Sequence, residues 1–283
     1  MMAKKLSLAV SLALLSACTL GPNYTRPDLG LNNSYRNAPS DSAQRAVSDI
    51  AWAGLFQDTE LSAVIRLAVE RNVDLQIAIT RIEASRAQSQ IARSQFFPSV
   101  SGAFGTSPNV SASSDNSYSL GAVLNWEVDF FGKIRRSNQA ARAELLASQD
   151  GARAVMSTLV ATTAVTWLNL RELDQELLIT QANIKTQENS LALVRTLMRG
   201  GVASGADEQQ AIVQLANTRA QLPRLQQAIL STENALSLLL GGQPGPIARN
   251  TKSNLPQTPL LPKAGMPSDL LERRPDVRAA EHI

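Results

Sequence analysis

The sequence is poor in the side chains that most enzymes use for nucleophilic, redox or metal chemistry. Its 283 residues include one cysteine, Cys18, and one histidine, His282. Cys18 cannot form an internal disulfide, and it has no second thiol or nearby histidine with which to bind a metal. His282 is the penultimate residue, a position that does not suit a Ser-His-Asp or Cys-His arrangement. We therefore expect no enzyme activity, no metal site and no cofactor.

Aromatic residues and net charge are also scarce. Phe, Trp and Tyr make up 4% of the chain, and Ala, Gln, Ser and Leu dominate its middle, as in proteins built from long helices. Without Lys4 and Lys5, the 27 basic side chains fall to 25, against 24 acidic ones. A nucleic-acid-binding protein needs a basic face, so no nucleic-acid partner is expected. No stretch after Cys18 is apolar enough for a transmembrane helix.

The first residues have the pattern of a bacterial secretory signal. Lys4 and Lys5 precede an apolar run, residues 6–15, and the small residues Ser16 and Ala17 precede Cys18. This predicts a signal peptide over 1–17 and a lipobox, in which the Cys18 sulfur receives a diacylglycerol and becomes the new N-terminus. The alternative is an ordinary signal peptide with an incidental cysteine. Thr19 follows Cys18, instead of the aspartate that commonly retains lipoproteins at the inner membrane, and this favours the outer membrane.

A change of periodicity marks the first folded region. Residues 18–57, rich in Pro, Asn, Ser and Gly, predict a lipidated, extended N-terminal segment. From Thr59, apolar residues recur at three- and four-residue spacing, which predicts a helix over 59–95. Asp58 or Thr59 is the expected N-cap, and Pro98 closes the segment.

Period-two alternation then predicts a β-hairpin over 99–128. Apolar side chains alternate with small or polar ones along 118–128, with Val123 as the exception, and more weakly along 99–104. Two runs of about ten residues with one apolar face fit a transmembrane hairpin. The strand pattern fits a soluble hairpin packed on a core equally well.

Two further helices are predicted, over 133–198 and 207–240. Leucine, isoleucine or methionine recurs every seven residues from 170 to 198, as in a coiled-coil seam. Pro223 should bend the second helix because it removes a backbone hydrogen bond. The pair should be antiparallel. At 1.5 Å per residue the long helix spans roughly 100 Å, which the helices 59–95 and 207–240 match when laid end to end.

The C-terminal part predicts a linker and the start of a repeat. Residues 243–268 hold six of the 13 prolines and predict a Pro-rich linker. The stretch 272–280, ERRPDVRAA, aligns with 70–78, ERNVDLQIA, at an offset of 272 − 70 = 202, with identical glutamate, first arginine, aspartate and final alanine. We interpret 58–242 as a first repeat and 269–283 as the start of a truncated second repeat.

Four motifs in order carry a family resemblance: CTLGPNYTRP, NWEVDFFGKIRR, MRGGVASGADEQQA and LLERRPDVRAAE. They resemble the mature N-terminus, the strand-to-helix passage, the tip turn and the start of the second half of the outer-membrane factor (TolC-like) family. These are the channel-tunnels of tripartite efflux pumps and type I secretion systems. The lipobox and the last motif resemble the lipoprotein branch that serves RND-type efflux pumps.

The resemblance implies a mainly α fold with a β-hairpin. Three protomers would share a transmembrane β-barrel in outer-membrane lipid and a long antiparallel coiled-coil α-barrel, the periplasmic tunnel. The implied partners are two further copies of the chain, a periplasmic adaptor (membrane fusion) protein and an inner-membrane pump. The acidic ring that narrows such tunnels would lie in the second half, so no gate residue is assigned.

Three candidate sites follow. Cys18 is the expected lipidation site. The expected membrane interface consists of an aromatic girdle and basic residues that meet phospholipid phosphates: Trp126, Phe130, Phe131, Lys133, Arg135 and Arg136. The expected adaptor-binding turn consists of Gly200, Gly201, Val202 and Ser204. Gly205-Ala206 departs from the acidic and apolar pair usual in the family, which puts the docking contacts there in doubt. A solvated basic end and a simple chain reversal are the plainer alternatives for these two sites.

Together with the lipobox, the resemblance implies a passive, trimeric, lipid-anchored exit duct for drugs or other small molecules, driven by an inner-membrane transporter. It would lie in the outer membrane and extend into the periplasm. The alternatives are a structural periplasmic coiled-coil lipoprotein with a soluble hairpin, or an inactive truncated fragment of such a channel.

Overall fold

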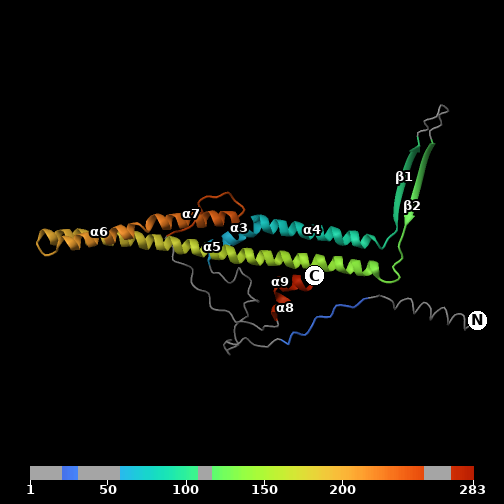
Figure 1. The fold of residues 1–283 in the computed structure, drawn as a ribbon, viewed down its shortest axis with the longest axis horizontal. Helices are drawn as coiled ribbons and strands as arrows, with labels where there is room; N and C mark the ends of the chain where they lie inside the picture. Colours follow the sequence, from blue (N-terminus) through green and yellow to red (C-terminus); the bar gives the residue numbers. More distant parts are fainter. Residues whose placement is uncertain (1–20, 31–57, 108–116, 252–268) are drawn as a thin grey trace, which may run out of the picture. The chain divides into compact units, whose positions relative to one another are not determined.

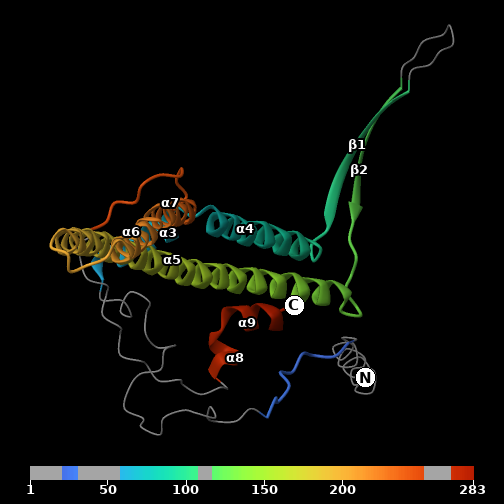
Figure 2. The same ribbon diagram turned by 60° about the vertical axis from the view of Figure 1, so that its left-hand side comes forward.

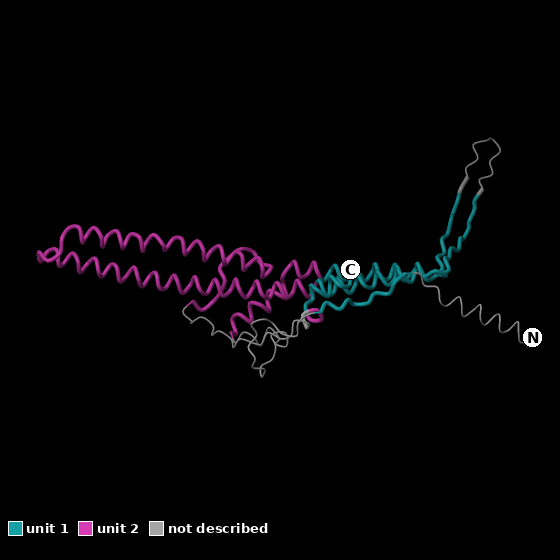
Figure 3. The backbone as a smooth tube through the Cα atoms, turned by 60° about the horizontal axis from the view of Figure 1, so that its bottom comes forward, with its two compact units in different colours: residues 1–31, 79–151, 274–283 teal, residues 32–78, 152–273 magenta. Residues whose placement is uncertain are grey.

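The computed structural model describes residues 21–30, 58–107, 117–251 and 269–283 and is mainly helical with one antiparallel hairpin (Figure 1). This confirms the predicted fold class. The predicted signal peptide, Cys18, the tip of the β-hairpin and most of the Pro-rich linker lie outside the described residues. The chain divides into two compact units (Figure 3), unit 1 with residues 1–31, 79–151 and 274–283, and unit 2 with residues 32–78 and 152–273.

Unit 2 is built on the second part of α5 (Lys133–Arg199), beside which α6 (Gly205–Arg219) and α7 (Leu222–Leu239) run in the opposite direction (Figures 1 and 2). Its core joins α5 and α7 to α3 (Thr59–Arg71) and the first turn of α4 (Val73–Ser94). The buried core residues are Leu61, Ile65, Ala68, Leu75, Leu159, Val160, Ala164, Trp167, Leu170, Leu236 and Leu240. Removal of these side chains from water is the main stabilising term of the unit.

The predicted helix 59–95 is two helices, which corrects the expectation of one. Asp58 is the N-cap of α3, and its carboxylate accepts hydrogen bonds from the N–H groups of Glu60 and Leu61. At Asn72 the backbone is extended, and the buried side chain of Asn72 accepts from the Leu75 N–H and donates to the Leu239 carbonyl. Asn72 therefore starts α4 and ties the corner to the end of α7.

The predicted helix 207–240 is also two helices. It begins at Gly205, is interrupted at Ala220 and Gln221, and resumes as α7, with Pro223 in the first turn. Pro223 has no N–H to donate to the Arg219 carbonyl, and proline is well tolerated in a first helical turn. Ala220 and Gln221 keep right-handed helical backbone angles, so the break between α6 and α7 is local, in keeping with the expected bend.

Within unit 2, an ionic cluster holds residues 243–251 against α5 and α7. Arg249 binds Asp174 of α5 through two hydrogen bonds of 2.6 and 2.8 Å, and it also binds Glu233 of α7. The side chains of Arg249 and Asp174 are 6% and 4% exposed. Arg171, also buried, donates to the Asn250 carbonyl and lies 3.6 Å from Asp174. These contacts attach the start of the predicted linker to two helices.

Unit 1 contains the β-hairpin and the helices at its base. Strand β1 (Ser99–Ser107) pairs with β2 (Ser117–Asn125), so the second strand is three residues shorter than predicted. Figures 1 and 2 show α4 and α5 side by side below the hairpin. The short helix α9 (Pro275–Glu281) also belongs to unit 1, whereas α8 (Asp269–Arg273) belongs to unit 2.

Candidate functional site

The register of the hairpin places its apolar residues on one face. Phe104 pairs with Leu120 and Val100 pairs with Leu124, while Ser101 pairs with Val123 and Gly105 with Ser119 on the opposite face. The rings of Phe104 and Tyr118, on neighbouring residue pairs of the apolar face, stack with centroids 6.4 Å apart. One face is therefore apolar and the other small or polar, apart from Val123.

The apolar face is not covered by the described part of the chain. Leu120 is 86% exposed, and Val100, Phe104, Tyr118 and Leu124 are each 68% to 71% exposed. A soluble hairpin would pack this face on a core. Lipid contact on one face and water on the other is the arrangement of a transmembrane β-barrel strand.

Exposed aromatic side chains surround the base of the hairpin. Trp126, Phe130 and Phe131 are 58%, 60% and 68% exposed. Trp126 Nε1 donates to the Phe96 carbonyl, which joins the passage after β2 to the passage before β1. Phe97, which the sequence analysis did not single out, is 64% exposed on that first passage. The predicted girdle residues thus have a fourth companion, which the adjacent aromatic pair at 96–97 could have indicated.

The predicted basic residues have carboxylate and carbonyl partners within the chain. Lys133 binds Glu127 at 3.0 Å, and Arg135 approaches Asp129 at 3.6 Å. Burial acts to raise the pKa of Asp129, but hydrogen bonds from the N–H groups of Arg135 and Ile134, together with the Arg135 charge, outweigh it and lower the pKa. Asp129 precedes α5, and its ionised carboxylate accepts from the Arg135 N–H, so it offsets the unfavourable basic charge at the start of the helix.

Arg136 differs from its two basic neighbours because it faces the N-terminal segment. Its guanidinium donates to the Gly21 carbonyl at 3.0 Å and to Gln139 at 2.9 Å. Lys133 and Arg135 remain 76% and 52% exposed, whereas Arg136 is half-buried. Lys133 and Arg135 are thus the members of the basic set that are open to an external anion.

The turn between α5 and α6 is closed by two complementary caps. Gly201 has φ +74°, its N–H donates to the Met198 carbonyl, and the Val202 N–H donates to the Leu197 carbonyl. This is a Schellman motif, which requires a left-handed residue and explains the glycine. Ser204 then begins α6 in a capping box with Asp207. Val202 lies between the caps and is 77% exposed.

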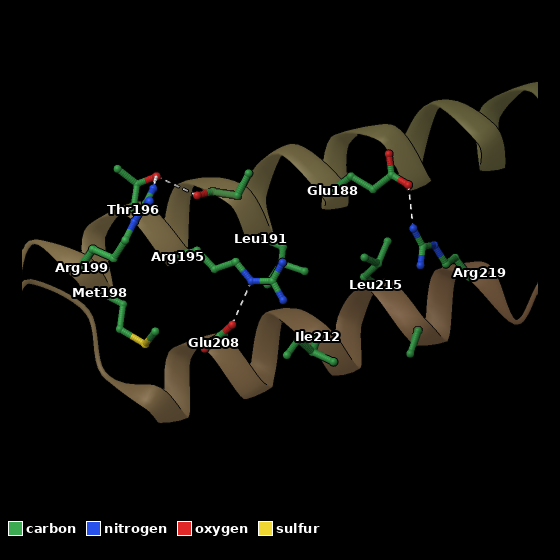
Figure 4. Close-up of a pocket in the computed structure, with 12 residues that line it drawn as sticks. Glu188, Leu191, Arg195, Thr196, Met198, Arg199, Glu208, Ile212, Leu215 and Arg219 are labelled. Atoms are coloured by element: carbon green, nitrogen blue, oxygen red, sulfur yellow. Dashed lines mark hydrogen bonds and ion pairs between the residues drawn. The ribbon is translucent and has the colours of Figure 1, made fainter.

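Ion pairs link α5 and α6 behind this turn. Arg195 binds Glu208 at 2.9 Å, and Arg219 binds Glu188 at 2.7 Å (Figure 4). The hydrogen bond from Arg219 holds the pKa of Glu188 below its usual value. Between the pairs lies an open groove of about 880 Å³ whose floor includes Leu191 and Leu215. The turn can be predicted from the sequence, but these pairs cannot, because they join residues 13 and 31 positions apart.

Within the described residues no helix is both long and apolar enough to cross a bilayer, and no group of acidic, histidine or cysteine side chains is placed to hold a metal. The candidate site is thus a surface: an exposed apolar hairpin with an aromatic and basic base in unit 1, and a capped helical turn in unit 2.

Comparison with known proteins agrees with a transmembrane hairpin of an outer-membrane protein. Residues 64–242 match the model of the family described as Outer membrane efflux protein. The chain is similar to the Antibiotic efflux pump outer membrane protein ArpC and to the Toluene efflux pump outer membrane protein TtgC, both of Pseudomonas putida. Each is 33% identical over 298 residues, which is 98% of this chain and 60% of the relative.

A solved structure has the same fold. The outer-membrane channel OprN superposes with a TM-score of 0.80 at 28% identity, over 94% of this chain and 61% of that channel. The chain therefore spans about 60% of the length of the relatives that it matches.

Proposed function

Because the chain belongs to the outer membrane efflux protein family, we propose that it contributes to the exit duct of a tripartite efflux system. Members of this family are outer-membrane transport conduits and not enzymes. The duct is passive: an inner-membrane pump supplies the energy, and a periplasmic adaptor joins the pump to the helical tunnel. Two relatives are named for antibiotic and toluene efflux, which supports small organic molecules as the cargo.

The exposed apolar face of the hairpin is the observation that carries the proposal. Five large apolar side chains on one face have no cover within the described residues. Apart from Val123, the side chains on the opposite face of the hairpin are small or polar. Two strands leave two open edges, which a bilayer does not tolerate. The barrel must therefore be completed by further strands, and we propose that these come from a homotrimer.

The other sites have places in the same assembly. Lipid on Cys18 anchors the chain, and no other cofactor is proposed. Trp126, Phe130, Phe131, Lys133 and Arg135 meet the headgroups at the periplasmic side of the barrel. Gly200, Gly201, Val202 and Ser204 form the turn that meets the adaptor. A photo-crosslinker at Val202 should capture the adaptor, and failure to do so in an assembled pump would contradict this role.

Paired substitutions on the two hairpin faces test the channel. Leu120→Arg puts a charge on the proposed lipid face, at a cost of roughly 2–4 kcal/mol near the bilayer midplane, whereas Ser101→Arg puts it on the proposed lumen face. We expect wild type and Ser101→Arg to give heat-modifiable trimers on gels of outer membranes, and Leu120→Arg to give none.

Each other outcome identifies an alternative. Leu120 and Ser101 are both exposed in the described chain, so a hairpin that stays in water would accept a charge at either position. Equal yields of folded protein from the two variants in the periplasm would therefore support a structural coiled-coil lipoprotein. Absence of trimers in the wild type would show that these 283 residues do not assemble a channel by themselves, as expected for an inactive fragment.

A further inference from the structure

Residues 21–30, here called the strap, are held on unit 1 mainly by polar contacts. All ten are exposed, including Tyr24 at 68% and Leu29 at 58%, so little apolar surface fixes them. A cavity of about 530 Å³ lies between the strap, α9 and Ala143 of α5. Because dispersion contacts are few, specific hydrogen bonds decide whether the strap is docked.

The stronger point of attachment is Glu281, in the last turn of α9. Arg26 donates to both carboxylate oxygens of Glu281, from Nε at 2.6 Å and from Nη2 at 2.5 Å. Tyr24 Oη donates to the same carboxylate at 3.0 Å. Glu281 thus receives three hydrogen bonds from two strap residues. Bidentate arginine–carboxylate pairs are both stronger and more directional than single ion pairs.

The helix that carries Glu281 is itself fixed to α5. Arg278 and His282, on either side of Glu281, lie 3.3 and 3.6 Å from the carboxylate of Asp150. The Asp150 side chain is 2% exposed. Glu281 is therefore mounted on a helix that a buried carboxylate of α5 orients.

Arg136 holds the other end of the strap. Its Nη2 donates to the Gly21 carbonyl, and its Nε is buried without a hydrogen-bond partner. Gly21 is three residues from Cys18, and three residues span at most about 10 Å. The first described residue of the strap, Gly21, is thus bound in the first turn of α5.

We propose that Glu281 and Arg136 are positioning residues that latch the strap and so hold the N-terminal anchor at the base of the hairpin. The latch pairs a segment near the N-terminus with the start of the predicted second repeat, so it closes only when α9 is docked on α5. The anchoring role rests on the proposed lipidation of Cys18, whereas the latch itself does not.

A nitroxide spin label on Asn23→Cys tests the latch in the purified full chain. In the wild-type background we expect an immobilised spectrum. We expect the immobilised component to be lost in Glu281→Gln. It should also be lost in Arg26→Lys, which keeps the positive charge but cannot form the two-pronged hydrogen bond of the guanidinium. The charge swap Arg26→Glu with Glu281→Arg should restore it. Glu83→Gln is the control, because Glu83 is likewise a carboxylate paired with an arginine, Arg86, although its side chain is 62% exposed against 20% for Glu281.

Label counting separates the latch from the lipidation. A lipidated Cys18 has no free thiol, so mass spectrometry should find one spin label per chain. Two labels per chain would refute lipidation of Cys18. The spectra of the strap would then be recorded in the Cys18→Ser background. A spectrum that stays immobilised in Glu281→Gln, or one that is already mobile in the wild type, would overturn the latch.

Discussion

Asn72 and Arg274 interrupt a helix in the same way, 274 − 72 = 202 residues apart. The backbone angles are φ −62° and ψ 128° at Asn72, and φ −71° and ψ 117° at Arg274. Each follows a helix that ends in Glu-Arg, and each precedes a helix with an aspartate in its first turn. This shared corner supports the predicted repeat more strongly than the four identities in nine residues.

The two corners are stabilised differently. The Asn72 side chain caps α4 and reaches the Leu239 carbonyl, whereas the Arg274 guanidinium folds onto Asp276 at 3.0 Å. The two corners therefore share their backbone geometry and flanking residues, whereas the side chain at the corner differs.

Gly241→Ala should destabilise unit 2, because a Cβ at this position would lie 2.3 Å from the Arg71 carbonyl oxygen and φ is +67°. The left-handed conformation and the overpacking together should lower the free energy of unfolding by about 2–5 kcal/mol. Chemical denaturation measures this. Gly242→Ala is the control, since the nearest atom to its Cβ lies at 3.7 Å and its φ is not positive. Equal effects of the two substitutions would contradict the close approach.

Arg249→Met should also destabilise unit 2, because it removes the guanidinium that binds the buried carboxylates of Asp174 and Glu233 and leaves Asp174 only the 3.6 Å contact with Arg171. Loss of one member of a buried ionic cluster lowers the free energy of unfolding by about 3–5 kcal/mol. Arg195→Met, which breaks a pair that is 54% exposed on the arginine side, should lower it by less than about 1 kcal/mol. If the two variants melt alike, the buried cluster is not a major determinant of stability.

The sequence predicts a structural feature correctly where the residues that determine it are close together in the chain. The N-cap Asp58, the glycine turn at 200–201 and the alternating strand all follow from spacing. The interruption at Asn72 was missed because its cap combines with a bond to Leu239, 167 residues away. The contact of Arg136 with Gly21, 115 residues earlier, is likewise not predicted, because nothing local to Arg136 indicates this acceptor. Long-range polar partners are thus what periodicity and composition leave open.

Ser204→Ala should fray the start of α6. The Ser204 hydroxyl accepts from the Asp207 N–H and donates to the Asp207 carboxylate. The hydrogen bonds that this carboxylate receives from the hydroxyl and the backbone N–H of Ser204 keep the pKa of Asp207 below its usual value. Loss of such a cap lowers helix stability by about 1 kcal/mol. Hydrogen exchange at residues 205–208 should therefore accelerate, while Ser190→Ala, at an exposed position inside α5, should leave it unchanged. Unaltered exchange in Ser204→Ala would mean that the turn is held by the Schellman motif alone.

Neutralising Lys133 and Arg135 together separates lipid contact from helix stability. Basic residues oppose the dipole at a helix N-terminus, so Lys133→Gln with Arg135→Gln should leave α5 as stable as before or slightly more so. If lipid phosphates bind these exposed cations, assembly in the outer membrane should fall even though the helix is intact. Arg142→Gln with Lys185→Gln, which removes two exposed cations elsewhere on α5, is the control. Normal trimer yield from the first variant would contradict the lipid contact.

Glu281 should make docking of the strap resistant to acid. The hydrogen bond from Arg26 is the largest influence, and with Tyr24 and the nearby His282 it lowers the pKa of Glu281 from 4.5 to about 2 against an opposing effect of burial. A carboxyl with a lowered folded-state pKa contributes stability that is fully present above about pH 4.5 and is lost as the pH falls toward 2. The difference in unfolding midpoint between wild type and Glu281→Gln should therefore be constant from pH 7 to about pH 5 and shrink below that. A difference that does not change down to pH 2 would show that the Glu281 charge does not hold the strap.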